Sequence, residues 1–127
     1  MSITRILIVA DTRETVDELR DFFEENGYET EVALNSKVAL AILEERRMDL
    51  VIIGFVVQDI SGIEILKNLR AMDPFIPVVL IQGDDTKRIK ALVKKAGAQE
   101  HIPEPIDKIS FLETVKKILA SHSSKVG

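Results

Sequence analysis

The most continuously apolar stretch of this 127-residue chain is Asp49-Leu50-Val51-Ile52-Ile53-Gly54-Phe55-Val56-Val57. A run this apolar is typical of a strand buried on both faces, as in a parallel sheet covered by helices. One glycine interrupts the run, although glycine packs no side chain and loses the most backbone entropy when a chain folds. From the residues alone, Gly54 indicates either a bulge or a place where the backbone packs closely against a neighbour.

Apolar runs of strand length recur along the chain, and each is followed by a segment whose apolar residues have helical spacing. Ser36, Ser61 and Asp107 are expected to cap the second, third and fifth helices. Gly27 and Gly97 are expected to end the first and fourth helices. Strict alternation of five strands and five helices predicts a doubly wound α/β fold, with a parallel sheet covered on both faces. The expected strands are 5–9, 28–32, 50–57, 78–81 and 99–102.

Composition limits the classes of function. The chain is 46% hydrophobic, enough for a core, and its net charge of −4 argues against general affinity for nucleic acid or anionic membrane. No cysteine is present, which excludes disulfides and thiol chemistry. No apolar run approaches the roughly 20 residues that span a bilayer, and no signal-peptide pattern is seen, so we expect a cytoplasmic protein. We expect residues 1–121 to form one domain and residues 122–127 a polar tail or the start of a linker.

A functional site is expected at one edge of the predicted sheet. Open parallel sheets place their sites outside the carboxyl ends of the strands, where the strand order reverses. The residues expected at these ends are Asp11, Gly54, Phe55, Gln82 and Glu104.

Motifs in the same order resemble the receiver domain of bacterial two-component response regulators, over essentially the full length of the chain. The run Ile6-Leu7-Ile8-Val9-Ala10-Asp11 resembles the first strand of that family, and the run from Asp49 to Ile53 resembles the strand that leads to its phosphorylated aspartate. The resemblance implies the flavodoxin-like receiver fold, a five-stranded sheet in the order 2-1-3-4-5. Further matches are Gly27-Tyr28-Glu29-Thr30, Ser61-Gly62-Ile63-Glu64-Ile65-Leu66, Leu69-Arg70, Pro77-Val78-Val79, Ala96-Gly97-Ala98 and Glu104-Pro105.

The sequence departs from the family where the family carries its chemistry. In typical receivers an aspartate after the third strand takes a phosphoryl group from phosphohistidine. Two acids after the first strand help to hold Mg²⁺, and a Thr or Ser and a lysine bind the phosphoryl oxygens. Such transfer depends on positioning and on neutralising charge. Here the phosphoacceptor position is Gly54, and the aromatic switch position is His101. The remaining residues of this degenerate pocket are Ala10, Asp11, Val56, Gln82 and Glu104.

The resemblance therefore implies a pseudo-receiver of a phosphorelay signalling system that is not an enzyme, is not phosphorylated on aspartate and acts by protein–protein interaction. No cofactor is expected, and Asp11 is the one weak candidate ligand for Mg²⁺. The expected partners are a histidine kinase, an output domain or a second copy joined through the fourth and fifth helices, with no nucleic acid or membrane. The expected partner surface consists of Lys87, Lys90, Lys94, His101 and Lys116.

Alternatives remain open at this stage. The chain would still be competent for phosphotransfer if it used residual metal binding or another acceptor, of which Asp59 is the nearest acid. A small-ligand module for a flavin or nucleotide would need a glycine-rich phosphate loop, whereas residues 10–15 contain two acids and no glycine. Simpler interpretations also exist: Asp11 as a turn residue, His101 as a half-buried strand residue, and the basic fourth helix as a solvated face.

Overall fold

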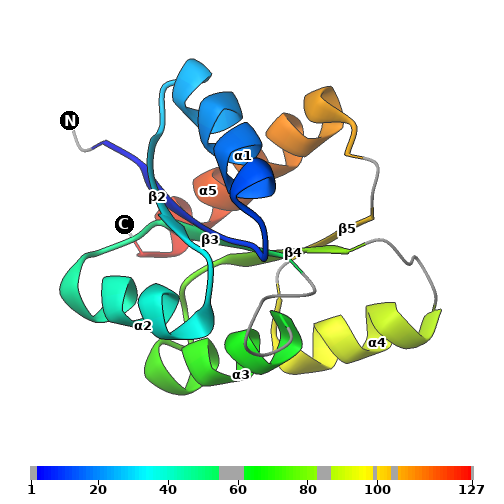
Figure 1. The fold of residues 1–127 in the computed structure, drawn as a ribbon. Helices are drawn as coiled ribbons and strands as arrows, with labels where there is room; N and C mark the ends of the chain where they lie inside the picture. The colour runs from blue at the N-terminus through cyan, green and yellow to red at the C-terminus, as the bar shows by residue number, and fades with distance from the viewer. Residues whose placement is uncertain (1–2, 55–61, 83–86, 99, 104–105, 127) are drawn as a thin grey trace.

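The computed structural model describes residues 3–54, 62–82, 87–98, 100–103 and 106–126, within which strands and helices alternate (Figure 1). The strands are β1 (Arg5–Val9), β2 (Glu29–Ala33), β3 (Leu50–Gly54), β4 (Val78–Gln82) and β5 (Glu100–Pro103). The helices are α1 (Arg13–Glu25), α2 (Ser36–Glu45), α3 (Gly62–Met72), α4 (Lys87–Ala96) and α5 (Lys108–Val126).

The described strands form one sheet in the order β2-β1-β3-β4-β5, and every neighbouring pair is parallel. Figure 1 shows α1 and α5 on one face of this sheet and α2, α3 and α4 on the other. The predicted flavodoxin-like arrangement of a parallel sheet between two helical layers is confirmed. The strand order reverses between β1 and β3, so the carboxyl ends of these two strands form the switch point.

The apolar run of β3 is explained by its central place in the sheet. Leu50 and Ile52 pack into the core beneath α1 and α5, whereas Val51 and Ile53 pack into the core beneath α2 and α3. Successive side chains of a strand point to opposite faces, so a strand covered on both sides needs apolar residues at every position. Residues 55–57, which the sequence assigns to the same strand, lie outside the described residues.

The two cores differ in composition. The core beneath α1 and α5 contains an aromatic cluster of Phe22, Phe23, Tyr28 and Phe111, whose ring centroids lie 5.2 to 6.0 Å apart in the contacting pairs. The buried residues of the opposite core are aliphatic apart from Met48. Aromatic pairs at these distances add about 0.5–1.5 kcal/mol each beyond the burial of their surface, so this cluster holds α1 and α5 together on the sheet.

Most of the predicted helix ends are confirmed, and one is wrong. Gly27 and Gly97 have positive φ angles of 90° and 98°, as expected for glycines that end helices. The side chain of Asp107 accepts a hydrogen bond from the backbone N–H of Ile109 at 3.1 Å and caps α5. The cap of α2 is Asn35 rather than Ser36, because the Asn35 side chain accepts from the N–H of Val38 and Ser36 is already helical. The predicted cap Ser61 lies outside the described residues.

The last helix is longer than the sequence suggested. It runs from Lys108 to Val126, so residues 122–126, assigned above to a polar tail, continue α5. In the part of the chain that the structure describes, no helix combines the length and apolarity needed to cross a membrane.

Candidate functional site

The carboxyl edge of the sheet brings the first three residues of the predicted site together. Ala10 follows β1, donates its N–H to the carbonyl of Ala33 at 3.2 Å and is only 2% exposed. Asp11 comes next and is half-buried. Gly54 is the last residue of β3, which lies beside β1 in the sheet. The switch point thus carries a methyl group, a carboxylate and a residue without a side chain.

The backbone at Gly54 does not require glycine. Its φ angle lies outside the left-handed region, and the residue pairs in regular register with Ile81 of β4. A Cβ added at this position would meet the carbonyl oxygen of Val9 and the Cα and Cβ of Ala10, all at 3.6 Å. These are ordinary van der Waals distances, so among the described residues neither a bulge nor a close approach of a neighbour accounts for this glycine. A side chain here would lie directly against Ala10.

The other predicted pocket residues are only partly described. The backbone of Gln82 ends β4, and that of His101 pairs with Leu80 in β5, but the side chains of both residues lie outside the described part of the chain. Val56 and Glu104 lie outside it entirely. Among the described residues, no group of three or more His, Cys, Asp or Glu is placed to hold a metal ion. Residual Mg²⁺ binding by Asp11 therefore stays a prediction.

The predicted partner surface is divided between two layers. Lys87, Lys90 and Lys94 are exposed on α4, and Lys116 is exposed on α5. Figure 1 places these helices on opposite faces of the sheet, beside the edge strand β5. The four lysines therefore belong to helices of two opposite layers.

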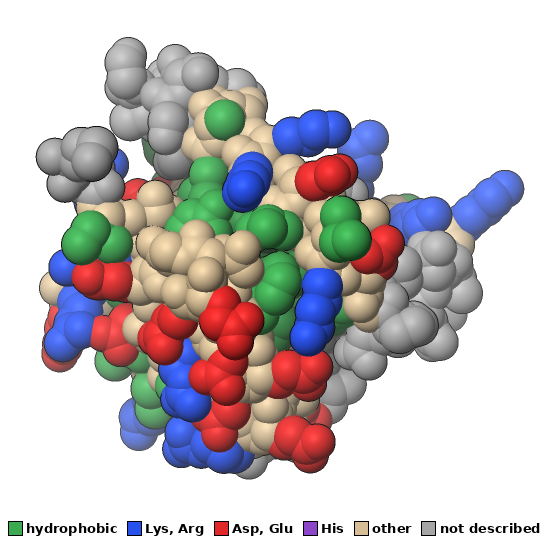
Figure 2. All heavy atoms as spheres, turned by 90° about the horizontal axis from the view of Figure 1, so that it is seen from above, with side chains coloured by type: hydrophobic (Ala, Val, Ile, Leu, Met, Phe, Trp, Pro, Cys, Tyr) green, Lys and Arg blue, Asp and Glu red, His purple; other side chains and the backbone are tan. Residues whose placement is uncertain are grey.

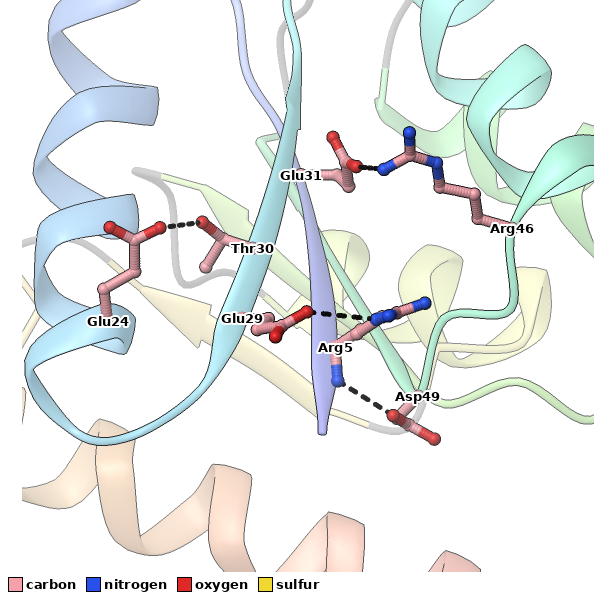
Figure 3. Close-up of polar contacts among 7 residues, drawn as sticks. All are labelled: Arg5, Glu24, Glu29, Thr30, Glu31, Arg46 and Asp49. Atoms are coloured by element: carbon pink, nitrogen blue, oxygen red, sulfur yellow. Dashed lines mark hydrogen bonds and ion pairs between the residues drawn. The ribbon is translucent and has the colours of Figure 1, made fainter. Parts of the chain in front are cut away.

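The amino edge of the sheet carries polar contacts that the sequence analysis did not identify (Figure 3). The backbone N–H of Arg5 donates to the Asp49 carboxylate at 2.8 Å, and the Arg5 side chain donates to Glu29 at 3.2 Å. Arg46, just after α2, forms an ion pair with Glu31 of β2. These contacts join β1, β2 and the segment that leads into β3.

Arg70 of α3 makes a separate set of contacts, with backbone carbonyls after α4 and before β4. Its guanidinium donates to the carbonyl of Gly97 from Nε at 3.0 Å and Nη2 at 2.8 Å, and to the carbonyl of Ile76 from Nη1 at 2.6 Å. Burial lowers the pKa of Arg70, and the nearby Asp73 carboxylate opposes that shift. The Leu69-Arg70 match does not predict these contacts, because one acceptor of Arg70 lies 27 residues along the chain.

A cleft of about 420 Å³ lies at this same amino edge, between the ends of α2 and α3. Its two acids already accept backbone hydrogen bonds: Asp49 from Arg5 at 2.8 Å, and Asp73 from Phe75 at 2.9 Å. The Phe75 residue is 75% exposed beside it. The cleft lies at the amino edge of the sheet and the predicted pocket at the carboxyl edge, so the two are separate features of the surface.

Comparison with known proteins gives a consistent result. The profile of the response regulator receiver domain matches residues 6–116. The polar-differentiation response regulator DivK of Brucella anthropi is 31% identical over 116 residues, which cover 90% of this chain and 94% of that protein. The sporulation initiation phosphotransferase F of Bacillus subtilis is 32% identical over 120 residues, which cover 94% of this chain and 97% of that protein.

Longer relatives and solved structures agree with these matches. The response regulator MprA of a Mycobacterium species is 27% identical across 97% of this chain, which spans about half (54%) of that relative. The crystal structure of a CheY-like receiver domain protein from Methanospirillum hungatei superimposes with a TM-score of 0.91 at 27% identity, covering 98% of this chain and 99% of that one. Because the profile covers most of the chain and the fold agrees throughout, this chain belongs to the response regulator receiver domain family.

Proposed function

We propose that this receiver domain is not phosphorylated on aspartate and works in its two-component pathway through protein contact. The observation that carries the proposal is the geometry of Gly54. Its backbone has room for a Cβ at ordinary contact distances and no left-handed φ angle, so nothing in the described part of the chain requires glycine at the phosphoacceptor position. A glycine offers no atom that can accept a phosphoryl group.

The neighbouring substitutions support the same conclusion. A Cβ at position 54 would touch Ala10, so the missing acceptor and the missing first acid belong to one site. The lysine of typical receivers pairs with the acceptor, and this chain has Glu104 in its place. Loss of only one member of such a pair would leave an unpaired charge or crowded carboxylates, whereas changing both avoids either cost.

The charge of the pocket does not by itself exclude a cation. Three acids and a lysine sum to −2 in typical receivers, and Asp11 with Glu104 gives the same sum here. Mg²⁺, however, requires near-ideal octahedral geometry and is usually held together with substrate phosphate. Asp11 lacks the adjacent acid and the acceptor carboxylate that would complete that geometry.

Incubation with acetyl phosphate and Mg²⁺, followed by intact-mass measurement, tests the proposal. We expect no phosphoryl adduct on the wild-type chain. A variant that rebuilds the site, with Ala10→Asp, Gly54→Asp, Gln82→Thr and Glu104→Lys, serves as the positive control. A base-labile phosphoryl adduct on the wild-type chain would overturn the proposal.

The single substitution Gly54→Asp tests whether an acceptor aspartate alone is enough for phosphorylation. We expect it to restore little phosphorylation, because the residues that hold the metal and neutralise the phosphoryl group would still be absent. Robust labelling of this variant would show that Ala10, Gln82 and Glu104 do not prevent phosphoryl transfer.

The alternative function is phosphotransfer through residual metal binding or another acceptor. It is supported by the similarity to a protein named a sporulation phosphotransferase. Titration with Mg²⁺ followed by amide NMR distinguishes the two functions. Saturable shifts centred on Asp11 and Glu104 would favour the alternative, and their absence would favour a contact module.

The proposed role is that of an interaction module, without catalytic activity of its own. Its partners would be a histidine kinase, an output domain or another protein of the same pathway, and its location the cytoplasm. Affinity capture with the wild-type chain, compared with the charge reversals Lys90→Glu and Lys94→Glu, would identify such partners and show whether α4 contacts them.

A further inference from the structure

Charge is distributed unevenly along this chain. Residues 87–127 contain nine basic and four acidic residues, whereas residues 1–86 contain eight basic and seventeen acidic ones. The two extremes are helices: α4 has five basic and no acidic residues, and α1 has six acidic and two basic residues. The molecule therefore has a strong electrostatic polarity in spite of its modest net charge.

The acidic residues of α1 form a stripe. Glu14, Glu18, Asp21 and Glu25 follow one another at helical spacing, so they share one face of the helix, and all four are exposed. Within the described residues, only Asp21 of these four has an ion pair, with Arg20 at 3.7 Å. Figure 2, which looks onto the α1 and α5 layer, shows acidic side chains gathered together on this face.

The basic residues of α4 form a matching stripe. Lys87, Lys90 and Lys94 also follow helical spacing and are exposed. At a rise of 1.5 Å per residue, this stripe is roughly 10 Å long and the α1 stripe roughly 16 Å long. Like charges at such spacing repel one another within a helix. Only the end members, Glu14 in the first turn of α1 and Lys94 in the last turn of α4, also gain from the helix dipole. Contact with a surface of opposite charge would offset the repulsion within each stripe.

One copy of the chain cannot bring the two stripes together, because α1 and α4 cover opposite faces of the sheet (Figure 1). A symmetric dimer that sets α4 directly against α4 is also disfavoured. Where α4 lies on the two-fold axis of an isologous interface it meets its twin, so Lys87, Lys90 and Lys94 of the two copies would face each other. Opposed like charges cost several kcal/mol across an interface. A contact between α4 of one copy and α1 of another pairs cations with anions instead.

We propose that a second copy of this chain docks its acidic α1 stripe onto the basic α4 stripe, head to tail. The stripes are Glu14, Glu18, Asp21 and Glu25 on one copy and Lys87, Lys90 and Lys94 on the other. Such a heterologous contact leaves an α1 stripe at one end and an α4 stripe at the other for further copies, so copies add into short chains. The contact is electrostatic and therefore weak and sensitive to salt. The inference rests on the proposal that this domain acts through protein contact.

Sedimentation equilibrium of the full chain and two charge-reversal variants tests the interface. The basic-stripe variant carries Lys87→Glu, Lys90→Glu and Lys94→Glu, and the acidic-stripe variant carries Glu18→Lys, Asp21→Lys and Glu25→Lys. A control variant with Lys37→Glu, Arg47→Glu and Lys67→Glu has the same change of net charge as the basic-stripe variant, at residues on neither stripe. Circular dichroism establishes that each variant is folded before its association is measured.

We expect the wild-type chain and the control to associate at about 0.01 M salt and to lose at least tenfold in association constant at about 1 M, where the Debye length falls from about 30 Å to 3 Å. Each stripe variant alone should remain monomeric, and an equimolar mixture of the two should associate again. A monomeric wild-type chain at low salt, an associating basic-stripe variant or a mixture that stays monomeric would overturn the proposal. These association measurements are independent of the acetyl phosphate assay. The head-to-tail contact and the absence of aspartate phosphorylation can therefore be contradicted separately.

Discussion

At the amino edge of the sheet, charged side chains hold the ends of β1, β2 and β3 together, whereas at the carboxyl edge Ala10 carries only a methyl group and Gly54 no side chain. The amino edge contains the Arg5 contacts with Asp49 and Glu29 and the ion pair between Arg46 and Glu31 (Figure 3). At Ala10 and Gly54, the edge where typical receivers place their chemistry thus carries no polar side chain.

The difference indicates that the two edges contribute differently to stability. Amino-edge side chains such as Asp49 and Arg70 hydrogen-bond backbone groups at strand and helix ends, which would otherwise lose partners on folding. At the carboxyl edge, Gly54 packs nothing and its backbone is relaxed. Substitutions at the amino edge should therefore lower the free energy of unfolding, and substitutions at Gly54 should hardly change it.

The largest effect is expected for Arg70→Ala. The substitution leaves the carbonyls of Ile76 and Gly97 without their donors, and it releases the end of α4 from α3. Hydrogen bonds to charged groups contribute about 1.5–3 kcal/mol, so we expect a loss of about 2–3 kcal/mol in the free energy of unfolding, measured with urea. The control is Lys67→Ala on the same helix, whose partner Glu64 is exposed, and its loss should stay below about 0.5 kcal/mol. Equal losses for the two variants would contradict the role given to Arg70.

Gly97→Ala disturbs the same contact between Arg70 of α3 and Gly97 at the end of α4, by changing Gly97. Gly97 has a φ angle of 98°, and a Cβ there would lie 3.0 Å from Nε of Arg70. Strain at such a backbone position costs about 1–3 kcal/mol, and we expect about 2 kcal/mol in urea unfolding. Gly27→Ala is the control, because Gly27 has a φ angle of 90° with no atom within 4 Å of an added Cβ. A Gly97 variant no less stable than the Gly27 variant would show that Arg70 simply moves aside.

Asp49→Ala removes the acceptor for the backbone N–H of Arg5, a bond of 2.8 Å at an exposed strand end. Because water can replace part of this bond, we expect a loss of about 1 kcal/mol in thermal or urea unfolding. Asp49→Asn keeps an acceptor oxygen and should retain most of that stability. If the Asn variant loses as much as the Ala variant, the negative charge rather than the hydrogen bond stabilises this edge.

Residues that act locally could be predicted from the sequence, and residues that act across the fold could not. The order of strands and helices follows from apolar periodicity, and the ends at Gly27 and Gly97 follow from the conformational freedom of glycine. The cap of α2 was misplaced by one residue because Asn35 and Ser36 are adjacent and both are good caps. The contacts of Arg70 could not be predicted, because they depend on how α3 and α4 pack together.

The candidate site was predictable to the same limited extent. The position of Gly54 at a strand end follows from the local sequence and from the family pattern. The space around it does not, because that space depends on Ala10 in a different strand. Only the assembled sheet shows that the described surroundings of Gly54 do not require glycine. Glycine at this position is therefore better explained by a loss of function than by a demand of the fold.

The smallest effect is expected for Gly54→Ala, and this prediction tests the comparison most directly. The added Cβ meets its nearest neighbours at 3.6 Å, and alanine restricts the unfolded chain more than glycine does. We therefore expect the free energy of unfolding to change by less than about 0.5 kcal/mol, or to rise slightly. Gly97→Ala under the same conditions is the reference for a glycine that the backbone requires. A loss above about 1.5 kcal/mol at Gly54, in the range of a strained backbone position, would mean that this strand end does need glycine, and the argument for a vacated phosphoacceptor would lose its main support.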